Sequence, residues 1–232
     1  MATLYIVGTP IGNLEDITLR AIRVLKEVDI ILCEDTRVTG RLLAKYDIAT
    51  PRMSYHAQSK LAKVEKIFAL LEEGKNLALV SDAGTPCISD PGVLLVAQVL
   101  ELKVKSGKLK VNIIPIPGPS ALVTALSAAG ISVAEFTFLG FLPHKKGRET
   151  LFKEIAESKR VMAFYESPHR ILKALESLEK FCGVDRGIIV ARELTKVYEE
   201  FVRGTIAEAR AHFAQNPDRV RGEFVVIVEG KK

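Results

Sequence analysis

The chain has 232 residues, of which 48% are hydrophobic, enough for the core of one large or two small domains and too many for a disordered chain. Its 33 Lys and Arg outnumber 28 Asp and Glu, and the resulting charge of +5 suits a polyanionic partner but is also common in ordinary enzymes. No apolar run approaches the roughly 18 residues of a membrane span, and no basic-then-apolar leader is visible, so we expect a cytoplasmic protein. Its three cysteines form no CxxC pair, which favours reduced thiols and no metal site.

Strand-like and helix-like segments alternate through the first half of the chain. We expect strands at residues 3–7, 29–33, 52–55, 77–80 and 111–115, and helices at residues 17–27, 37–46, 61–73 and 92–104. The strands are short and rich in Val, Ile and Leu, as strands are when both faces are buried, and the helices space their apolar residues by three and four. This pattern predicts a mainly parallel sheet with helices on both faces.

A second unit is expected to begin after residues 115–119, so the predicted domains are 1–116 and 117–232. Residues 115–120 either start a helix, with Pro119 in its first turn, or contribute to a ligand site at the domain junction. Helices are expected at residues 120–129, 147–157, 168–181 and 206–213, and strands at 136–139, 160–164, 187–190, 199–203 and 223–228. Antiparallel pairing of 199–203 with 223–228 would make this a mixed sheet.

The segment from Gly8 to Asp16 follows the first expected strand and leads into a helix, so it is placed to present backbone N–H groups to a ligand. Two phosphate-binding motifs do not fit it. A P-loop ends in Gly-Lys-Ser/Thr, whereas Asn13-Leu14 stands here. A dinucleotide fingerprint needs GxGxxG, but Pro10 takes the place of the second glycine and has no N–H to offer. A plain strand-to-helix turn is the alternative.

The stretch Val80–Gly92 is the strongest signal. It follows a buried strand, and 10 of its 13 residues are Gly, Pro, Asp, Ser, Thr or Ala. A simple connection needs only about 2–6 residues. Small residues allow a ligand close to the backbone, and Asp82, at the strand end, can accept hydrogen bonds from hydroxyl or amino groups. Asp90 is expected to cap a helix that starts at Pro91-Gly92.

Charged groups follow other strands. Glu34-Asp35-Thr36-Arg37 predicts either a helix cap with a surface ion pair or a substrate-facing cluster that holds a general base. Residues 164–170 follow a strand in the same way, and His169 there is either a surface histidine or a base. The basic run at residues 145–148 is either simply solvated or holds a phosphate backbone.

Taken together, these stretches resemble the tetrapyrrole methylase superfamily of S-adenosylmethionine (SAM)-dependent methyltransferases. The resemblance covers nearly the whole chain and is carried by Leu4–Leu25, Glu34–Arg37, Val80–Gly92, Ile116–Gly130, Phe138–Pro143 and Phe164–Arg170. Precorrin and uroporphyrinogen methylases usually have a Gly-x-Gly-x-Gly-Asp first loop and a compact Gly-Asp-Pro loop. This chain departs from both, so the resemblance favours the branch that acts on ribosomal RNA. That branch tends to be rich in His, Asn and Glu at residues 54–59, where this chain has only His56.

The resemblance implies a two-domain α/β fold, with a mostly parallel N-terminal sheet, a mixed C-terminal sheet, the cofactor SAM in the cleft between them, and a homodimer. It also implies 2′-O-methylation of a cytidine ribose in the 16S rRNA of the small ribosomal subunit, without a metal. The implied SAM-binding residues are Thr9, Pro10, Asp82, Ala83, Gly84, Thr85, Pro86, Pro117, Ser120, Ala121, Leu122 and Phe164. The implied catalytic residues are Glu34, Asp35, Arg37 and Glu166, with Asp82 as a further candidate base. The implied RNA-binding residues are Lys145, Lys146, Arg148, His169 and Arg170.

Two alternatives stay open at this point, and a third is disfavoured. A tetrapyrrole methyltransferase would share the fold and the cofactor, and it would methylate porphyrinoids without ribosomes. A non-catalytic ribosome-assembly factor would bind the subunit whether or not SAM is present. An NAD-linked oxidoreductase is disfavoured, because Pro10 is incompatible with the phosphate loop that it needs.

Overall fold

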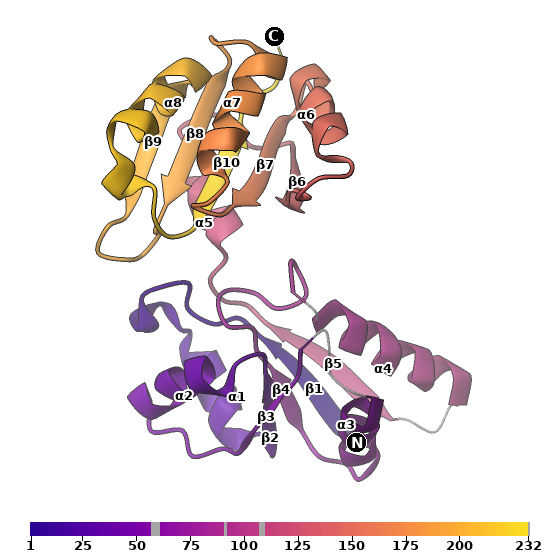
Figure 1. Ribbon diagram of the computed structural model, residues 1–232. Helices are drawn as coiled ribbons and strands as arrows, with labels where there is room; N and C mark the ends of the chain where they lie inside the picture. Colours follow the sequence, from indigo (N-terminus) through magenta and orange to yellow (C-terminus); the bar gives the residue numbers. More distant parts are fainter. Residues whose placement is uncertain (57–60, 91, 107–109, 232) are drawn as a thin grey trace. The chain divides into compact units, whose positions relative to one another are not determined.

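The computed structural model describes residues 1–56, 61–90, 92–106 and 110–231. The chain forms two compact units, Met1–Ser120 and Ala121–Lys232, and each unit has its own sheet (Figure 1). The domain boundary expected between residues 116 and 117 stays a prediction. Within the described ranges, no helix is both long enough and apolar enough to span a membrane.

The sheet of unit 1 is parallel throughout, as predicted. Its strands are β1 (Ala2–Val7), β2 (Ile30–Cys33), β3 (Arg52–Ser54), β4 (Leu77–Leu79) and β5 (Val111–Ile116), in the order β3-β2-β4-β1-β5. Strand β1 lies between β4 and β5, and its Leu4 is opposite Leu77 of β4 and Ile113 of β5. Since all five strands run the same way, their carboxyl ends share one edge, where ligands bind in open α/β sheets.

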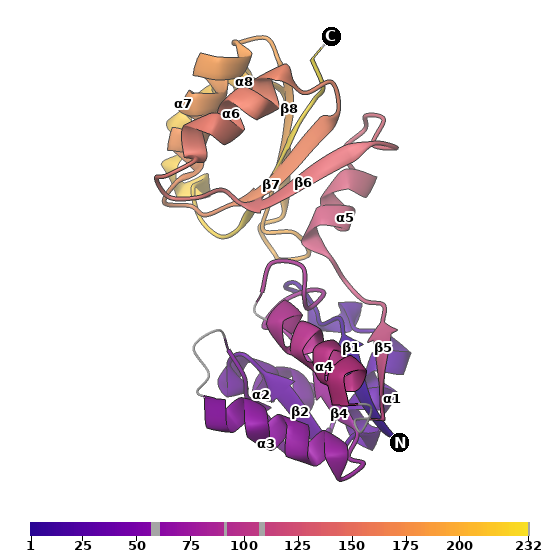
Figure 2. The same cartoon turned by 90° about the vertical axis from the view of Figure 1, so that its right-hand side faces the viewer.

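Helices cover both faces of this sheet. They are α1 (Leu19–Glu27), α2 (Thr36–Lys45), α3 (Leu61–Glu72) and α4 (Gly92–Ser106), with a short 3₁₀ helix, η1 (Leu14–Asp16), before α1. Alternate strand residues pack against opposite layers: Leu4 and Ile6 join the core under α3 and α4, whereas Val7 joins the core under α1 and α2. Figure 2 shows α3 and α4 together on one side of the sheet. The predicted burial of both faces is confirmed.

Unit 2 holds a mixed sheet, also as predicted. Its strands are β6 (Phe136–Phe141), β7 (Val161–Glu166), β8 (Gly187–Arg192), β9 (Glu200–Thr205) and β10 (Phe224–Val228), in the order β6-β7-β10-β8-β9. Strands β6 and β7 are parallel, and the other neighbours are antiparallel.

The strand pairing expected at residues 199–203 and 223–228 is wrong. Strand β9 pairs with β8, whereas β10 lies between β7 and β8. The physical reason lies in the two sequences. All five residues of β10 are apolar and buried, which only a central strand can achieve, and β9 carries the exposed Arg203 and Gly204 at the sheet edge.

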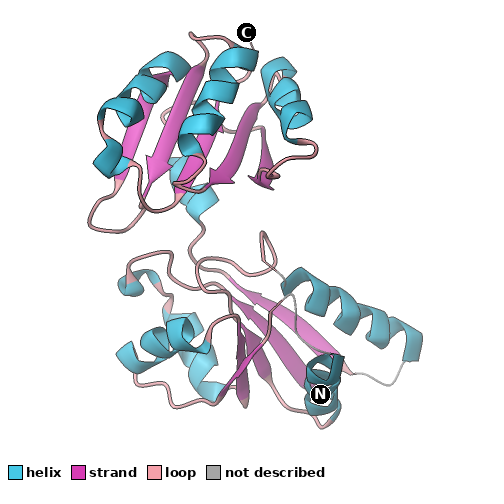
Figure 3. Cartoon of the chain, viewed as in Figure 1, coloured by secondary structure: helices cyan, strands magenta, loops and turns pink. Residues whose placement is uncertain are grey.

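The two faces of this second sheet are covered differently. Helices α6 (Arg148–Glu157), α7 (Ile171–Cys182) and α8 (Ile206–Gln215) lie together on one face (Figure 3), and α5 (Ala121–Ser127) lies on the other (Figure 2). A second 3₁₀ helix, η2 (Pro217–Arg219), follows α8. Helix α7 buries Ile171, Ala174, Leu175 and Leu178, the three-and-four spacing of an amphipathic helix.

Candidate functional site

The loops after β1 and β4 are joined at the carboxyl edge of the unit 1 sheet. The Thr9 N–H donates to the Gly84 carbonyl at 2.9 Å, and the Gly84 N–H donates to the Thr9 carbonyl at 3.0 Å. These residues lie 75 positions apart in sequence, so the exchange links two separate motifs predicted to bind the cofactor. It ties the two loops to each other through their backbones.

Two buried hydroxyl groups reinforce this junction. The Thr9 hydroxyl lies 3.1 Å from the Ser81 carbonyl and 3.3 Å from the Gly84 carbonyl. The Ser81 hydroxyl lies 3.1 Å from the Ala83 carbonyl and 3.2 Å from the Gly84 carbonyl. Gly84 adopts a φ of 83°, a conformation that favours glycine, so the tight turn after β4 depends on this residue.

The loop after β5 joins the same junction through a glycine–glycine contact. A Cβ atom added to Gly118 would lie 2.9 Å from three backbone atoms of Gly8, so only two glycines allow this approach. The Gly8 N–H also donates to the Ile116 carbonyl at 3.2 Å, and the Thr85 hydroxyl donates to the Pro119 carbonyl at 3.0 Å. Three loops therefore form one backbone scaffold.

The exposed part of this scaffold carries small and acidic groups. Asp82 and Ala83 are exposed, whereas Pro10 and Pro86 beside them are buried. The Asp82 Oδ1 accepts a hydrogen bond of 3.0 Å from the backbone N–H of Asp35, which ties the loop after β2 to the loop after β4. The scaffold thus presents a carboxylate and an exposed, small-residue backbone to a ligand.

The two carboxylates after β2 differ in environment. Burial raises the pKa of Glu34, and the charges of Asp82 and Asp90 raise it further, against a hydrogen bond from the Asp82 backbone. The Asp35 carboxylate instead caps α2, accepts from the Arg37 N–H at 2.8 Å and pairs with the Arg37 guanidinium at 2.6 Å. The hydrogen bonds from Arg37 hold the pKa of Asp35 far below its usual range. Glu34 is therefore the better placed of the two to accept a proton near neutral pH.

Asp90 acts at the start of α4, as its sequence position predicts. Its carboxylate accepts hydrogen bonds from the N–H groups of Cys87 and Gly92, at 2.9–3.0 Å. Cys87 has a φ of 70°, so these bonds stabilise a backbone conformation that a cysteine rarely adopts. Pro91, the expected first residue of the helix, lies outside the described residues.

Glu166, the predicted catalytic residue of unit 2, lies at the carboxyl end of β7 with its side chain fully buried. Its Oε2 is 2.9 Å from Arg148, and its Oε1 is 2.7 Å from Arg170 and accepts from the Ser167 N–H at 2.9 Å. Each oxygen therefore has a charged partner, which is the arrangement of a buried structural ion cluster. The predicted catalytic role of Glu166 stays a prediction, and its surroundings favour a structural role.

The other predicted residues lie in contrasting places. Phe164 and Leu122 are buried apolar side chains of unit 2, so any contact of Phe164 with a cofactor would use its backbone. Pro117, Ser120 and Ala121 lie at or beside the junction of the two units. Lys145, Lys146 and His169 are exposed, and Arg148 and Arg170 point their guanidinium groups at Glu166.

Sequence reasoning missed three contributors to this site. Gly8 and Gly118 were not singled out, although a glycine directly after a strand and a second glycine between two prolines are a usable signal for close backbone contact. Ser81 was also missed. Its neighbour Asp82 carries the charge, but the buried Ser81 hydroxyl helps to set the loop in which Asp82 stands.

The fold and this scaffold agree with a match of residues 3–210 to the family described as Tetrapyrrole (Corrin/Porphyrin) Methylases, and the chain belongs to this family. The resemblance inferred from the motifs is thereby confirmed. Solved structures agree in fold. A cobalt precorrin-4 methyltransferase of cobalamin biosynthesis superposes with a TM-score of 0.67 at 20% identity over 98% of this chain and 94% of its own. Uroporphyrin-III-C-methyltransferase from Thermus thermophilus superposes with a TM-score of 0.65 at 18% identity, over 97% and 93%.

Curated relatives narrow the resemblance to the RNA branch. A protein of Thermotoga maritima named ribosomal RNA small subunit methyltransferase I is 46% identical over the full length of both chains. Proteins of the same name from Synechocystis sp. and Halalkalibacterium halodurans are 46% and 49% identical over 99% and 98% of this chain, and over 80% and 76% of their own lengths. The chain is therefore similar to ribosomal RNA small subunit methyltransferase I, as the motifs indicated.

Proposed function

We propose that the protein transfers a methyl group from SAM to the 2′-oxygen of a cytidine ribose in the 16S rRNA of the small ribosomal subunit. The observation that supports this most directly is the scaffold built by the loops after β1, β4 and β5, joined by the Thr9–Gly84 exchange. The near-full-length identity to proteins named for small-subunit rRNA methylation supports the choice of substrate.

The donor set of unit 1 fits a nucleoside cofactor. The exposed Asp82 carboxylate can accept hydrogen bonds from hydroxyl or amino groups, and the small, exposed Ala83 beside it leaves room for a ligand next to the backbone. In this proposal the residues from Asp82 to Pro86, with Thr9 and Pro10, hold SAM, which supplies an activated methyl group on a sulfonium. Holding the ribose hydroxyl in line with that group can lower the barrier by roughly 7–11 kcal/mol without a metal.

The chain supplies the base in this mechanism through Glu34. Its raised pKa brings its proton affinity closer to neutral pH, where a general base works best. As the ribose oxygen bonds to the methyl carbon and the bond from that carbon to the sulfonium sulfur breaks, with S-adenosylhomocysteine as the leaving group, Glu34 would take up the hydroxyl proton and later release it to solvent. Asp35 is less suited, because its ion pair with Arg37 holds its pKa low.

Labelling of ribosomal subunits tests the proposal. The protein is incubated with methyl-labelled SAM and either undermethylated small subunits, free 16S rRNA or a porphyrinoid, and the modified nucleotide is mapped. Label on a cytidine ribose is expected. Label on a base would refute 2′-O transfer, and label on the porphyrinoid alone would favour the tetrapyrrole alternative. Subunit binding that is indifferent to SAM, without transfer, would favour an assembly factor.

The oligomeric state and the cellular location belong to the same proposal. The family resemblance implies a homodimer in the cytoplasm, where assembling small subunits are found. Light scattering of the purified protein checks the first point, because a monomer at micromolar concentration would contradict it. Fractionation of cells that express the protein checks the second.

A further inference from the structure

Three aromatic side chains gather at the end of β6 and β7 because β6 contains a bulge. Phe138 lies opposite Ala163, and Phe141 lies opposite Tyr165, so β6 advances three residues while β7 advances two. Gly140, within the bulge, has a φ of 63°. A bulge of this kind redirects the side chains that follow it. As a result both phenylalanine rings contact the Tyr165 ring, with centroids 4.9 and 5.3 Å apart.

This group, Phe138, Phe141 and Tyr165, is called the aromatic platform below. Phe164 packs in the core under α6–α8, so its neighbour Tyr165 points to the opposite face of the sheet. Strand β6 is an edge strand, and the Phe141 side chain is 52% exposed. Phe138 and Tyr165 are half-buried, so the platform presents mainly the Phe141 ring to solvent, supported by the two rings beside it.

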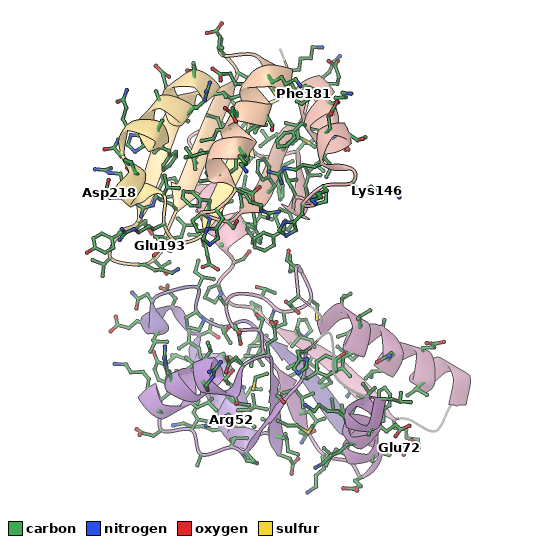
Figure 4. All side chains as sticks on the ribbon, in the orientation of Figure 1. Arg52, Glu72, Lys146, Phe181, Glu193 and Asp218 are labelled. Atoms are coloured by element: carbon green, nitrogen blue, oxygen red, sulfur yellow. The ribbon has the colours of Figure 1, made fainter. Side chains whose placement is uncertain are left out.

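Cations follow the platform directly. The loop from Leu142 to Gly147 connects it to α6 and carries His144, Lys145 and Lys146, all exposed. Figure 4 shows Lys146 extending away from the ribbon. The sequence from residue 136 to 148, which holds Phe138, Phe141 and the loop, contains no Asp or Glu, so its charged side chains are all basic. Proteins bind single-stranded nucleic acids with exposed aromatic rings, on which bases stack, and with nearby cations that contact the phosphates.

The buried ion cluster holds this loop in place. Arg148 donates to the Pro143 carbonyl at 3.2 Å, and Arg170 donates to the Leu142 carbonyl at 2.9 Å. Both arginines are bound by Glu166, whose side chain is fully buried. Glu166 thus fixes the path of the loop through the two guanidinium groups.

We propose that the segment Phe141–Lys146 binds single-stranded RNA of the substrate, with a base stacked on the aromatic platform and phosphates at Lys145 and Lys146. Glu166 is then a positioning residue that holds this segment, and it is not the base. This inference rests on the proposed function and adds the element of unit 2 that binds the substrate. An aromatic surface could instead contact a second copy of this chain, and the tests below distinguish RNA binding from such a subunit contact.

The first test removes the exposed ring. Phe141→Ala is expected to raise KM for small subunits about tenfold, the loss of one stacking contact, while kcat and SAM affinity stay unchanged. Phe141→Trp should restore KM, because a larger ring also stacks. Phe136→Ala is the matched control, since Phe136 is an exposed phenylalanine at the other end of β6. Equal KM values for both alanine variants would overturn the role of the platform.

The second test removes the two lysines. Lys145→Ala/Lys146→Ala should weaken binding of an RNA oligonucleotide and reduce the slope of log K against log salt by about 1.4, or about 0.7 for each lost single-strand phosphate contact. Lys159→Ala/Lys180→Ala removes the same charge from exposed sites at the opposite end of α6 and α7 and should leave the slope unchanged. Equal slopes for the two double variants would overturn the phosphate contacts.

The third test separates positioning from base catalysis. Glu166→Gln should raise KM for subunits with little change in kcat and with an unchanged pH profile of kcat. A base at this position predicts instead a fall in kcat of about 10²–10⁴-fold and the loss of the acidic limb of that profile. If the variant does not fold, the exposed Phe141 and lysine variants still decide the inference.

Three further outcomes have fixed meanings. Light scattering would assign the platform to a subunit contact if Phe141→Ala, but not Phe136→Ala, converts an oligomer to a monomer. That result would overturn the RNA assignment. A wild-type protein that methylates subunits, with variants indistinguishable from their controls, would refute this inference alone. A wild-type protein that leaves every RNA substrate unmethylated would refute the proposed function.

Discussion

Replacing Gly118 with alanine should separate the loops that build the candidate cofactor scaffold. The added Cβ would lie 2.9 Å from the Gly8 carbonyl carbon, Cα and carbonyl oxygen. Carbon atoms pack at about 3.5–4.0 Å, so the two loops must move apart by roughly 0.5–1 Å. All the opposing atoms belong to backbone, so no side chain can rotate away to relieve the contact.

The size of the effect follows from this geometry. Forcing an extra methyl group into a packed site costs about 1–3 kcal/mol. For a unit of this size, about 4 °C of melting temperature corresponds to 1 kcal/mol, so unit 1 should melt ~4–12 °C lower. The movement of the loops also disturbs the hydrogen bond from the Gly8 N–H to the Ile116 carbonyl and the neighbouring Thr9–Gly84 hydrogen bonds. SAM should therefore bind at least about tenfold more weakly.

Thermal unfolding followed by circular dichroism measures the stability, and isothermal titration calorimetry measures SAM affinity. Gly40→Ala is the matched control, because its added Cβ would meet only the flexible end of Arg52, at 3.1 Å. Gly40 lies inside α2, where alanine is favoured over glycine by about 1 kcal/mol. The control should therefore keep or raise the melting temperature. A Gly118→Ala protein with the melting temperature and SAM affinity of wild type would refute the reasoning.

Three other predictions concern ionisable groups. Glu34→Gln should lower kcat about 10²–10⁴-fold. The same change should stabilise unit 1 at neutral pH. Burial and the charge of Asp82 raise the pKa of Glu34, so its charged form is disfavoured in the folded state. Urea unfolding should show that this gain disappears below the pKa of the unfolded glutamate, and an unchanged kcat would remove Glu34 from the mechanism. Burial raises the pKa of Cys87 to about 11, so its thiol should react with a disulfide reagent at pH 8 roughly 100-fold more slowly than in urea; equal rates would contradict this. Glu200→Ala should destabilise unit 2 by about 3 kcal/mol, because it leaves Arg192, with a side chain 7% exposed, without its carboxylate. Burial alone would raise the pKa of Glu200, but the hydrogen bonds from two arginines outweigh burial, so the pKa of Glu200 in the folded protein is lowered. The difference in the free energy of unfolding between variant and wild type should therefore persist at neutral pH and shrink as the pH falls through that folded-state pKa. A difference that is independent of pH would argue against the ion pair.

Much of the fold was predictable because its signals are local. Strands such as β1 and β4 are short and mostly apolar, and helices such as α3 space their apolar residues by three and four. The error in unit 2 arose where the signal is not local. Adjacency in the sequence suggested that β9 pairs with β10, but the burial of all five β10 residues required a central position between β7 and β8.

The candidate site was predictable in its location more than in its contacts. Glycine- and proline-rich loops after strands indicated where Asp82 and Glu34 stand. Their environments depend on distant residues: the Asp82 carboxylate binds the N–H of Asp35, 47 positions away. Glu166 was a candidate base by its place at a strand end, whereas its two arginines, one of them 18 positions away, favour a structural role.

The sequence by itself determined the class of fold, the parallel and mixed character of the two sheets, and the family, because hydrophobic periodicity and the long Ser-Asp-Ala-Gly-Thr-Pro motif are properties of contiguous residues. Only the tertiary structure decided which loops touch, which carboxylate is shielded and which is paired with an arginine. Those properties arise from burial and from contacts between residues far apart in the chain. Gly8 against Gly118 is the clearest case, since neither glycine indicates its partner until β1 and β5 lie side by side.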